Sequence, residues 1–166
     1  QNSLIGGTAG DALTTGSYNT AFGISALTRD TAGSKSVAIG TTALAYQNFT
    51  SATDAFNTAV GHEAGLSVTT GVQNTLMGGL AGDALTDADS NVAVGYLSLS
   101  TNVLGSRNTA VGESALFATN PDSASNTYNT ALGYHAGRLI STGVQNTIMG
   151  GLAGDAITTG NYNISA

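Results

Sequence analysis

The sequence contains no cysteine and no tryptophan, has a single proline, and only 8% of its residues are charged. The absence of cysteine excludes disulfides, thiolate metal sites and cysteine nucleophiles. Ten acidic residues against four basic ones give a net charge of -6 with no basic run, which argues against nucleic acid and anionic membranes as partners. No apolar stretch approaches the roughly 20 residues that cross a bilayer, so we expect no membrane insertion.

What the chain has instead is small residues at fixed intervals. It contains 23 glycines, and alanine, threonine, serine and asparagine fill most of the remainder. Such a composition can indicate disorder, but 41% of the residues are hydrophobic and they recur periodically, which favours an ordered, closely packed chain.

A five-residue unit recurs along the whole chain. It reads Asn, then Thr, Val or Ser, then Ala, Leu or Ile, then a large apolar residue, then Gly, and successive units are 17 or 21 residues apart. The two 21-residue steps are four units apart, so four units make a super-unit of 72 residues. We therefore expect residues 1–166 to be a single continuous repeat array, a segment of a longer fibre. The units start at Asn2, Asn19, Ser36, Asn57, Asn74, Asn91, Asn108, Asn129 and Asn146, with another opening at Asn163.

The spacing predicts an all-β fold, a parallel β-solenoid or β-roll with about 17 residues per coil and one strand in each. A repeat this short leaves no room for a helical hairpin. The unit alternates as a strand does, and we expect its large apolar residue, such as Phe22 or Met77, to fill the coil. The small middle residue, such as Ala21 or Ala38, would then face a neighbouring chain, which predicts a homotrimer around the fibre axis.

Two columns of identical residues are predicted to run along the stack. The asparagine side chains would form a ladder of amides parallel to the axis, with Ser36 as an interruption. The glycines that end each unit would adopt positive φ or allow close backbone approach. The ladder residues are Asn19, Asn57, Asn74, Asn91, Asn108, Asn129 and Asn146, with Gly23, Gly40, Gly61, Gly78, Gly95, Gly112, Gly133 and Gly150.

The two four-residue insertions, within 46–56 and 117–128, are the strongest candidates for surface binding. Each should bulge outward and present aromatic rings, which can stack on sugars or contact protein, although packing against the coil is the simpler interpretation. Asn48-Phe49-Thr50 also matches a glycosylation acceptor. The candidate residues are Tyr46, Asn48, Phe49, Phe56, Phe117, Pro121 and Tyr128.

Other polar motifs favour structural roles. GGLAGDAL at 78–85 is a poor match to calcium-binding β-roll repeats, because Asp11, Asp83 and Asp155 are four coils apart, so we expect turn-capping carboxylates. His62 and His135 are similarly separated and are interpreted as surface residues. We predict no catalytic residue, no metal and no cofactor, and hence no enzyme.

SVAIG at 36–40 and the NTAVG-type units resemble the head repeats of trimeric autotransporter adhesins, which are trimers of parallel β-rolls with a shorter step. The fuller pattern, NTA-apolar-G followed by AL or AG and a TTG-like turn, is similar to repeats of phage tail fibres and other virion fibres. The resemblance covers the whole chain, and the 72-residue super-unit departs from simple versions of it.

Together these features predict a rigid spacer in a phage tail fibre or similar extracellular appendage, at the cell or virion surface, with a role in host-surface adhesion through a glycan or protein. The alternatives are a bacterial trimeric adhesin head and a chain that polymerises end to end into an extracellular filament. A polysaccharide-degrading tailspike would need paired carboxylates in a groove, and the acidic residues here are few and out of phase.

Overall fold

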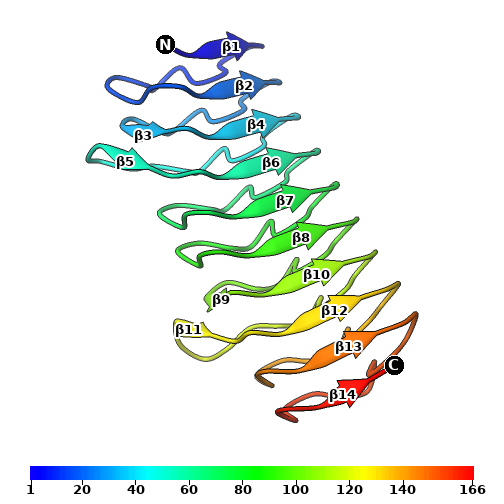
Figure 1. Ribbon diagram of the computed structural model, residues 1–166. Coiled ribbons are helices and arrows are strands. Elements are labelled where there is room, and N and C mark those ends of the chain that lie inside the picture. Colours follow the sequence, from blue (N-terminus) through cyan, green and yellow to red (C-terminus); the bar gives the residue numbers. More distant parts are fainter.

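Ten short parallel strands form one continuous sheet in the computed structural model, which describes all 166 residues. Successive coils stack in a column, each with one strand running in the same direction (Figure 1). The predicted parallel β-solenoid is confirmed. In order, the strands are β1 (Ser3–Ile5), β2 (Thr20–Phe22), β4 (Val37–Ile39), β6 (Thr58–Val60), β7 (Thr75–Met77), β8 (Val92–Val94), β10 (Thr109–Val111), β12 (Thr130–Leu132), β13 (Thr147–Met149) and β14 (Ile164–Ser165).

The repeat units lie in register from coil to coil. Ala21 pairs with Ala38, and Ala38 with Ala59, although the second step is four residues longer than the first. The extra residues are accommodated away from the main sheet, where each insertion adds a small parallel pair: β3 (Gly33–Ser34) with β5 (Thr53–Asp54), and β9 (Gly105–Ser106) with β11 (Ser125–Asn126). Figure 1 shows β5 and β11 at the ends of their coils, away from the strand arrowheads.

The return leg of each coil is a run of turns rather than a strand. Two residues of each run, such as Ser25 and Leu27, have left-handed backbone with φ of 55° and 54°. The turns are nevertheless hydrogen-bonded to the neighbouring coils. The Ser25 amide donates to the Gly7 carbonyl of the preceding coil (2.8 Å), and the Leu27 amide donates to the Ala43 carbonyl of the next (3.0 Å). Hydrogen bonds between coils therefore run along the axis on both legs.

The prediction of which strand face is internal was wrong. The middle residues of the main-sheet strands from β2 to β13 are fully buried inside the coil, as Ala21, Ala93 and Ile148 illustrate, whereas the large apolar third residues point outward and Phe22 is 55% exposed. The predicted alternation of the two strand faces was correct, but the faces assigned to the interior and to the outside were exchanged. The physical reason is that side chains from the return leg already occupy the narrow interior, so most coils accept only alanine opposite them.

The interior is filled in two ways that alternate along the stack. Where the fourth residue after the motif glycine is leucine, the seventh is polar, as with Leu27 and Asp30. Where the fourth is glycine, the seventh is apolar, as with Gly82 and Leu85. Both leucine and glycine are left-handed at this position, a conformation that costs a non-glycine residue about 1 kcal/mol. The buried leucines therefore offset strain by filling space.

Large middle residues are matched to these glycines. A Cβ on Gly82 would lie 2.8 Å from Leu76 Cδ2, and one on Gly65 would lie 2.7 Å from Leu76 Cδ1. Gly79, which follows the motif glycine directly after Leu76 and Met77, is not part of this match, because it lies on the outside, where its nearest neighbour is the Tyr96 ring. Volume compensation is present, at a different glycine.

Candidate functional site

The first insertion is anchored by a buried polar network. The Asp30 carboxylate accepts hydrogen bonds from the Gly33 amide (3.0 Å), the Phe49 amide (3.1 Å) and Gln47 Nε2 (2.6 Å). Phe49 packs against Gly33, where a Cβ would lie 2.7 Å from the ring. Asp30 and Gln47 are both fully buried. The insertion is therefore held at its base by a carboxylate whose oxygens are occupied.

The second insertion uses a neutral version of the same anchor. Asn102, 72 residues after Asp30, accepts from the Gly105 amide (2.8 Å) and donates to the Gly105 carbonyl (2.7 Å). Pro121 replaces Phe49 and lies beside Gly105. Thr127 Oγ1 donates to Asn108 Oδ1 (2.7 Å), which ties the end of the insertion to the asparagine ladder.

The structure separates the predicted insertion residues into two groups. Phe49 and Pro121 are buried and form the anchors just described, so neither presents a binding surface. The residues that remain on the surface are Tyr46, Asn48, Phe56 and Tyr128, with Phe117 half-buried.

Each exposed or half-buried aromatic at an insertion boundary carries a cation from a neighbouring coil. The chain has four basic side chains, and all four lie over one of these rings. Sequence reasoning missed these pairs, although each cation is one coil step, 17 or 21 residues, from its ring. The pairs are Arg29 Cζ over Tyr46 (4.2 Å), Lys35 Nζ over Phe56 (5.1 Å), Arg107 Cζ over Tyr128 (5.8 Å) and Arg138 Cζ over Phe117 (5.6 Å).

The asparagines form an axial ladder in the interior. Asn91 donates to Asn74 Oδ1 through its backbone amide (3.0 Å) and its Nδ2 (3.2 Å), while Asn74 Nδ2 donates to the Ala88 carbonyl (2.8 Å). At Ser36, where the side-chain amide is missing, Gln47 supplies one. Its Nε2 donates to Ser36 Oγ (3.1 Å), and its Oε1 accepts from Asn57 Nδ2 (2.8 Å).

The motif glycines stack directly on one another. Gly95 has a φ of 130°, and a Cβ there would lie 2.6 Å from the Gly112 carbonyl oxygen. Positive φ and close approach, the two reasons considered from the sequence, act together at this column.

The outward face of the main sheet is uncharged and carries a continuous row of apolar residues. This row, the third residue of each three-residue strand, we call the outer stripe; the first residues, which flank it, are threonine or serine in seven of the ten strands. Met77 and Met149 are 43% and 51% exposed, and the valine and leucine members are half-buried. In a single chain the stripe is open to solvent along the whole stack, which is unusual for a surface that is apolar over this length. Its members are Ile5, Phe22, Ile39, Val60, Met77, Val94, Val111, Leu132 and Met149.

The acidic residues and histidines do not gather into one cluster. Asp11 and Asp83 accept hydrogen bonds from hydroxyls of the next coil, Thr28 (2.7 Å) and Ser100 (2.6 Å), rather than capping their own turns. Partial burial raises the pKa of Asp83, against the lowering effect of the Ser100 hydrogen bond. His62 Nε2 lies 3.7 Å from Glu63. No group of three His, Asp or Glu side chains is placed to hold a metal ion.

The chain has no helix long and apolar enough to cross a membrane. No protein-family model, curated protein or solved structure matches this chain.

Proposed function

We propose that this chain is a rigid structural segment of an extracellular or virion-surface fibre, of the phage tail-fibre type, that associates with copies of itself. The observation that carries the proposal is the uninterrupted ten-strand stack, in which amide and glycine columns run along the axis and both legs are bonded along it. A stack bonded in this way is rigid along its whole axis. The role involves no catalysis, cofactor or nucleic acid.

The outer stripe supports self-association. It is continuous, lacks charge, and is bordered at the strand starts by Lys35, Arg107 and Tyr128, which resembles the apolar centre and polar rim of protein interfaces. A second copy offers the same repeat spacing, so apolar rows of two chains match coil for coil. Three copies, as in the fibres that the repeats resemble, would enclose the stripes around one axis. The contact surface is thus the opposite strand face from the one predicted.

Solution mass and shape test the proposal. We expect light scattering to give 49.2 kDa, three times the chain mass of 16.4 kDa, and small-angle scattering to show a rod of about 45 Å for ten coils at the interstrand spacing. A compact sphere would contradict the fibre role. A mass that rises continuously with concentration would indicate the end-to-end filament instead.

Three single variants locate the contact. Val94→Lys and Val111→Lys place charges on the outer stripe and should give folded monomers. Thr41→Lys places the same charge on an exposed position outside the stripe and should leave the mass unchanged. Equal masses for all three variants would exclude the stripe as the interface.

A further inference from the structure

The four cation–ring pairs are about twice the number expected for a chain of this length. Energetically significant pairs of this kind occur about once per 70 to 80 residues, so a chain of this length would carry about two. Here every basic residue is in such a pair, and all four rings bound the two insertions. The arrangement sets the basic groups of an acidic chain beside its only two irregular coils.

The pairs differ in whether the cation has a polar partner. Lys35 Nζ lies 2.7 Å from Asp54, and Arg107 Nε donates to Asn126 Oδ1 (3.1 Å). Arg29 and Arg138 make no ion pair and no side-chain hydrogen bond, although acidic residues outnumber basic ones ten to four. Their guanidinium carbons lie over a ring, and no hydrogen bond or ion pair engages their terminal nitrogens.

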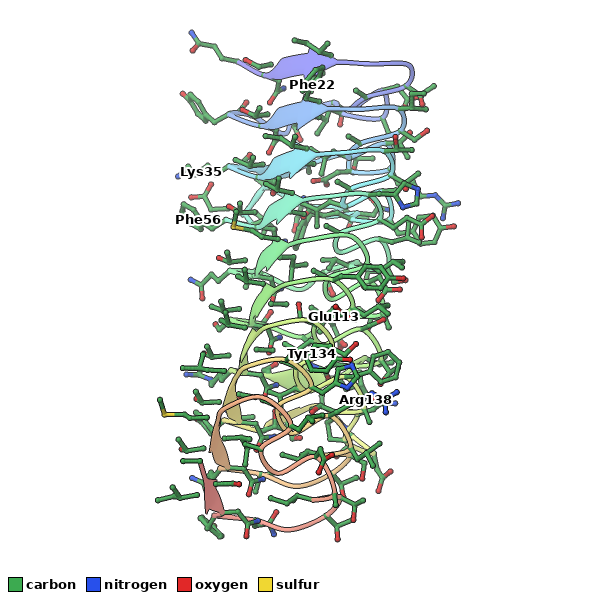
Figure 2. The ribbon with its side chains drawn as sticks, turned by 90° about the vertical axis from the view of Figure 1, so that its right-hand side faces the viewer. Phe22, Lys35, Phe56, Glu113, Tyr134 and Arg138 are labelled. Carbon is green, nitrogen blue, oxygen red and sulfur yellow. The ribbon has the colours of Figure 1, made fainter.

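The unengaged pairs lie away from the proposed interface. Figure 2 shows Arg138 on the side of the rod opposite Lys35 and Phe56. Arg29 occupies the adjoining position in the turn run, six residues after its motif glycine where Arg138 is five after its own. This face remains open when copies cover the outer stripe.

Two carboxylates of neighbouring coils, Asp11 and Asp155, form no ion pair with the arginines. Asp11 accepts from Thr28 Oγ1, and Asp155, one coil beyond Arg138, forms no ion pair. Arg138 Nε is buried without a partner, which leaves its terminal nitrogens as the donors available to a ligand.

We propose that Arg29–Tyr46 and Arg138–Phe117 are two sites for a carboxylated saccharide, which deepens the adhesive part of the proposed function and rests on it. A guanidinium edge binds a sugar carboxylate through two parallel hydrogen bonds, and the neighbouring ring packs against the apolar C–H face of the sugar. Lysine provides no such fork. The sites are five coils apart, about 24 Å at the interstrand spacing, so one polymer can engage both and gain avidity.

The net charge of -6 does not prevent this binding. Asp155, one coil from Arg138, opposes anion binding there, but carboxylates beyond about 8 Å are screened at physiological ionic strength, whereas a contact pair is screened much less. Binding should therefore survive physiological salt.

The test is calorimetric titration of the assembled protein with oligogalacturonate and with its methyl ester, which has the same sugars without the charge. We expect binding of the acid and at least about tenfold weaker binding of the ester. Arg29→Gln with Arg138→Gln should abolish binding, and Tyr46→Ala with Phe117→Ala should weaken it with all charges kept. Lys35→Gln with Arg107→Gln is the matched control and should bind as the unaltered protein does.

Four outcomes overturn the proposal: no binding of the acid, equal binding of the ester, equal loss in both cation pairs, or equal binding of dextran sulfate, which would indicate general attraction to polyanions. Circular dichroism and light scattering on the same samples separate these outcomes from misfolding. If binding is lost but the mass and the rod shape are retained, only the saccharide sites are contradicted and the proposed fibre role is unaffected. A monomeric globule would contradict the fibre role itself.

Discussion

The two insertions occupy equivalent positions in the 72-residue super-unit but are held by different chemistry. The first uses Asp30, Gln47 and Phe49, with a buried carboxylate and amide, whereas the second uses Asn102, Thr119 and Pro121. The difference follows from the asparagine ladder. Ser36 lacks an amide where Asn108 has one, so the first insertion must supply it from Gln47. The ladder is therefore the constraint, and the insertions adapt to it.

The comparison predicts that Gln47 is much less replaceable than its counterpart. Gln47→Ala leaves Asp30 Oδ2 and Asn57 Nδ2 buried without this partner, and should lower the free energy of unfolding by about 3 kcal/mol or more. Thr119→Ala loses one hydrogen bond to the Ile140 carbonyl and should cost about 1 kcal/mol. Urea unfolding followed by circular dichroism measures both, and equal losses would show that ladder repair is not the role of Gln47.

Transplanting the second anchor into the first sharpens the same difference. Gln47→Thr alone should cost about 2 kcal/mol, because Asp30 loses its donor and the ladder stays open. Adding Ser36→Asn and Asp30→Asn restores the amide column and removes the buried charge, and should return stability to within about 1 kcal/mol of the original chain. If the triple variant unfolds at the same or a lower urea concentration than Gln47→Thr, this explanation is contradicted.

The smallest expected change in stability comes from Asp83, which lies in a regular coil between the two insertions. Burial raises the pKa of Asp83 above its unfolded value, so ionisation of Asp83 lowers the stability of the folded chain. This loss of stability is absent below the unfolded pKa and complete above the folded pKa. Asp83→Asn should therefore raise the melting temperature slightly near neutral pH, and this gain should vanish as the pH falls below about 3.9.

Ser100→Ala provides the complementary variant. It removes the hydrogen bond that lowers the pKa of Asp83, so the chain should lose more stability between acidic and neutral pH than the unaltered protein. Identical melting curves against pH for all three chains would mean that Asp83 is not the titrating group.

The repeat was sufficient to predict the coil length, the strand in each coil and the existence of asparagine and glycine columns. It did not give the correct inner face, because large apolar residues were assumed to form the core. The asparagine column contained the missing information: residues two apart share a strand face, so inward Asn19 places Ala21 inward and Phe22 outward.

The insertion anchors were harder to predict. Phe49 and Pro121 were predicted as surface-binding candidates, but both are buried. Their burial depends on Gly33 and Gly105 in the preceding coil, contacts that sequence spacing alone does not specify. The polar interior residues Asp30 and Gln47 were missed because a charged or amide residue is seldom fully buried.

Because the backbone hydrogen bonds between coils run along the axis, tension applied to the two ends would load them in series. A single chain under such a pull should peel one coil at a time at a force that does not grow with the number of coils. Side-by-side association of chains would instead share the load across several stacks. The force needed to break the assembly would then depend on the number of chains in its cross-section rather than on its length.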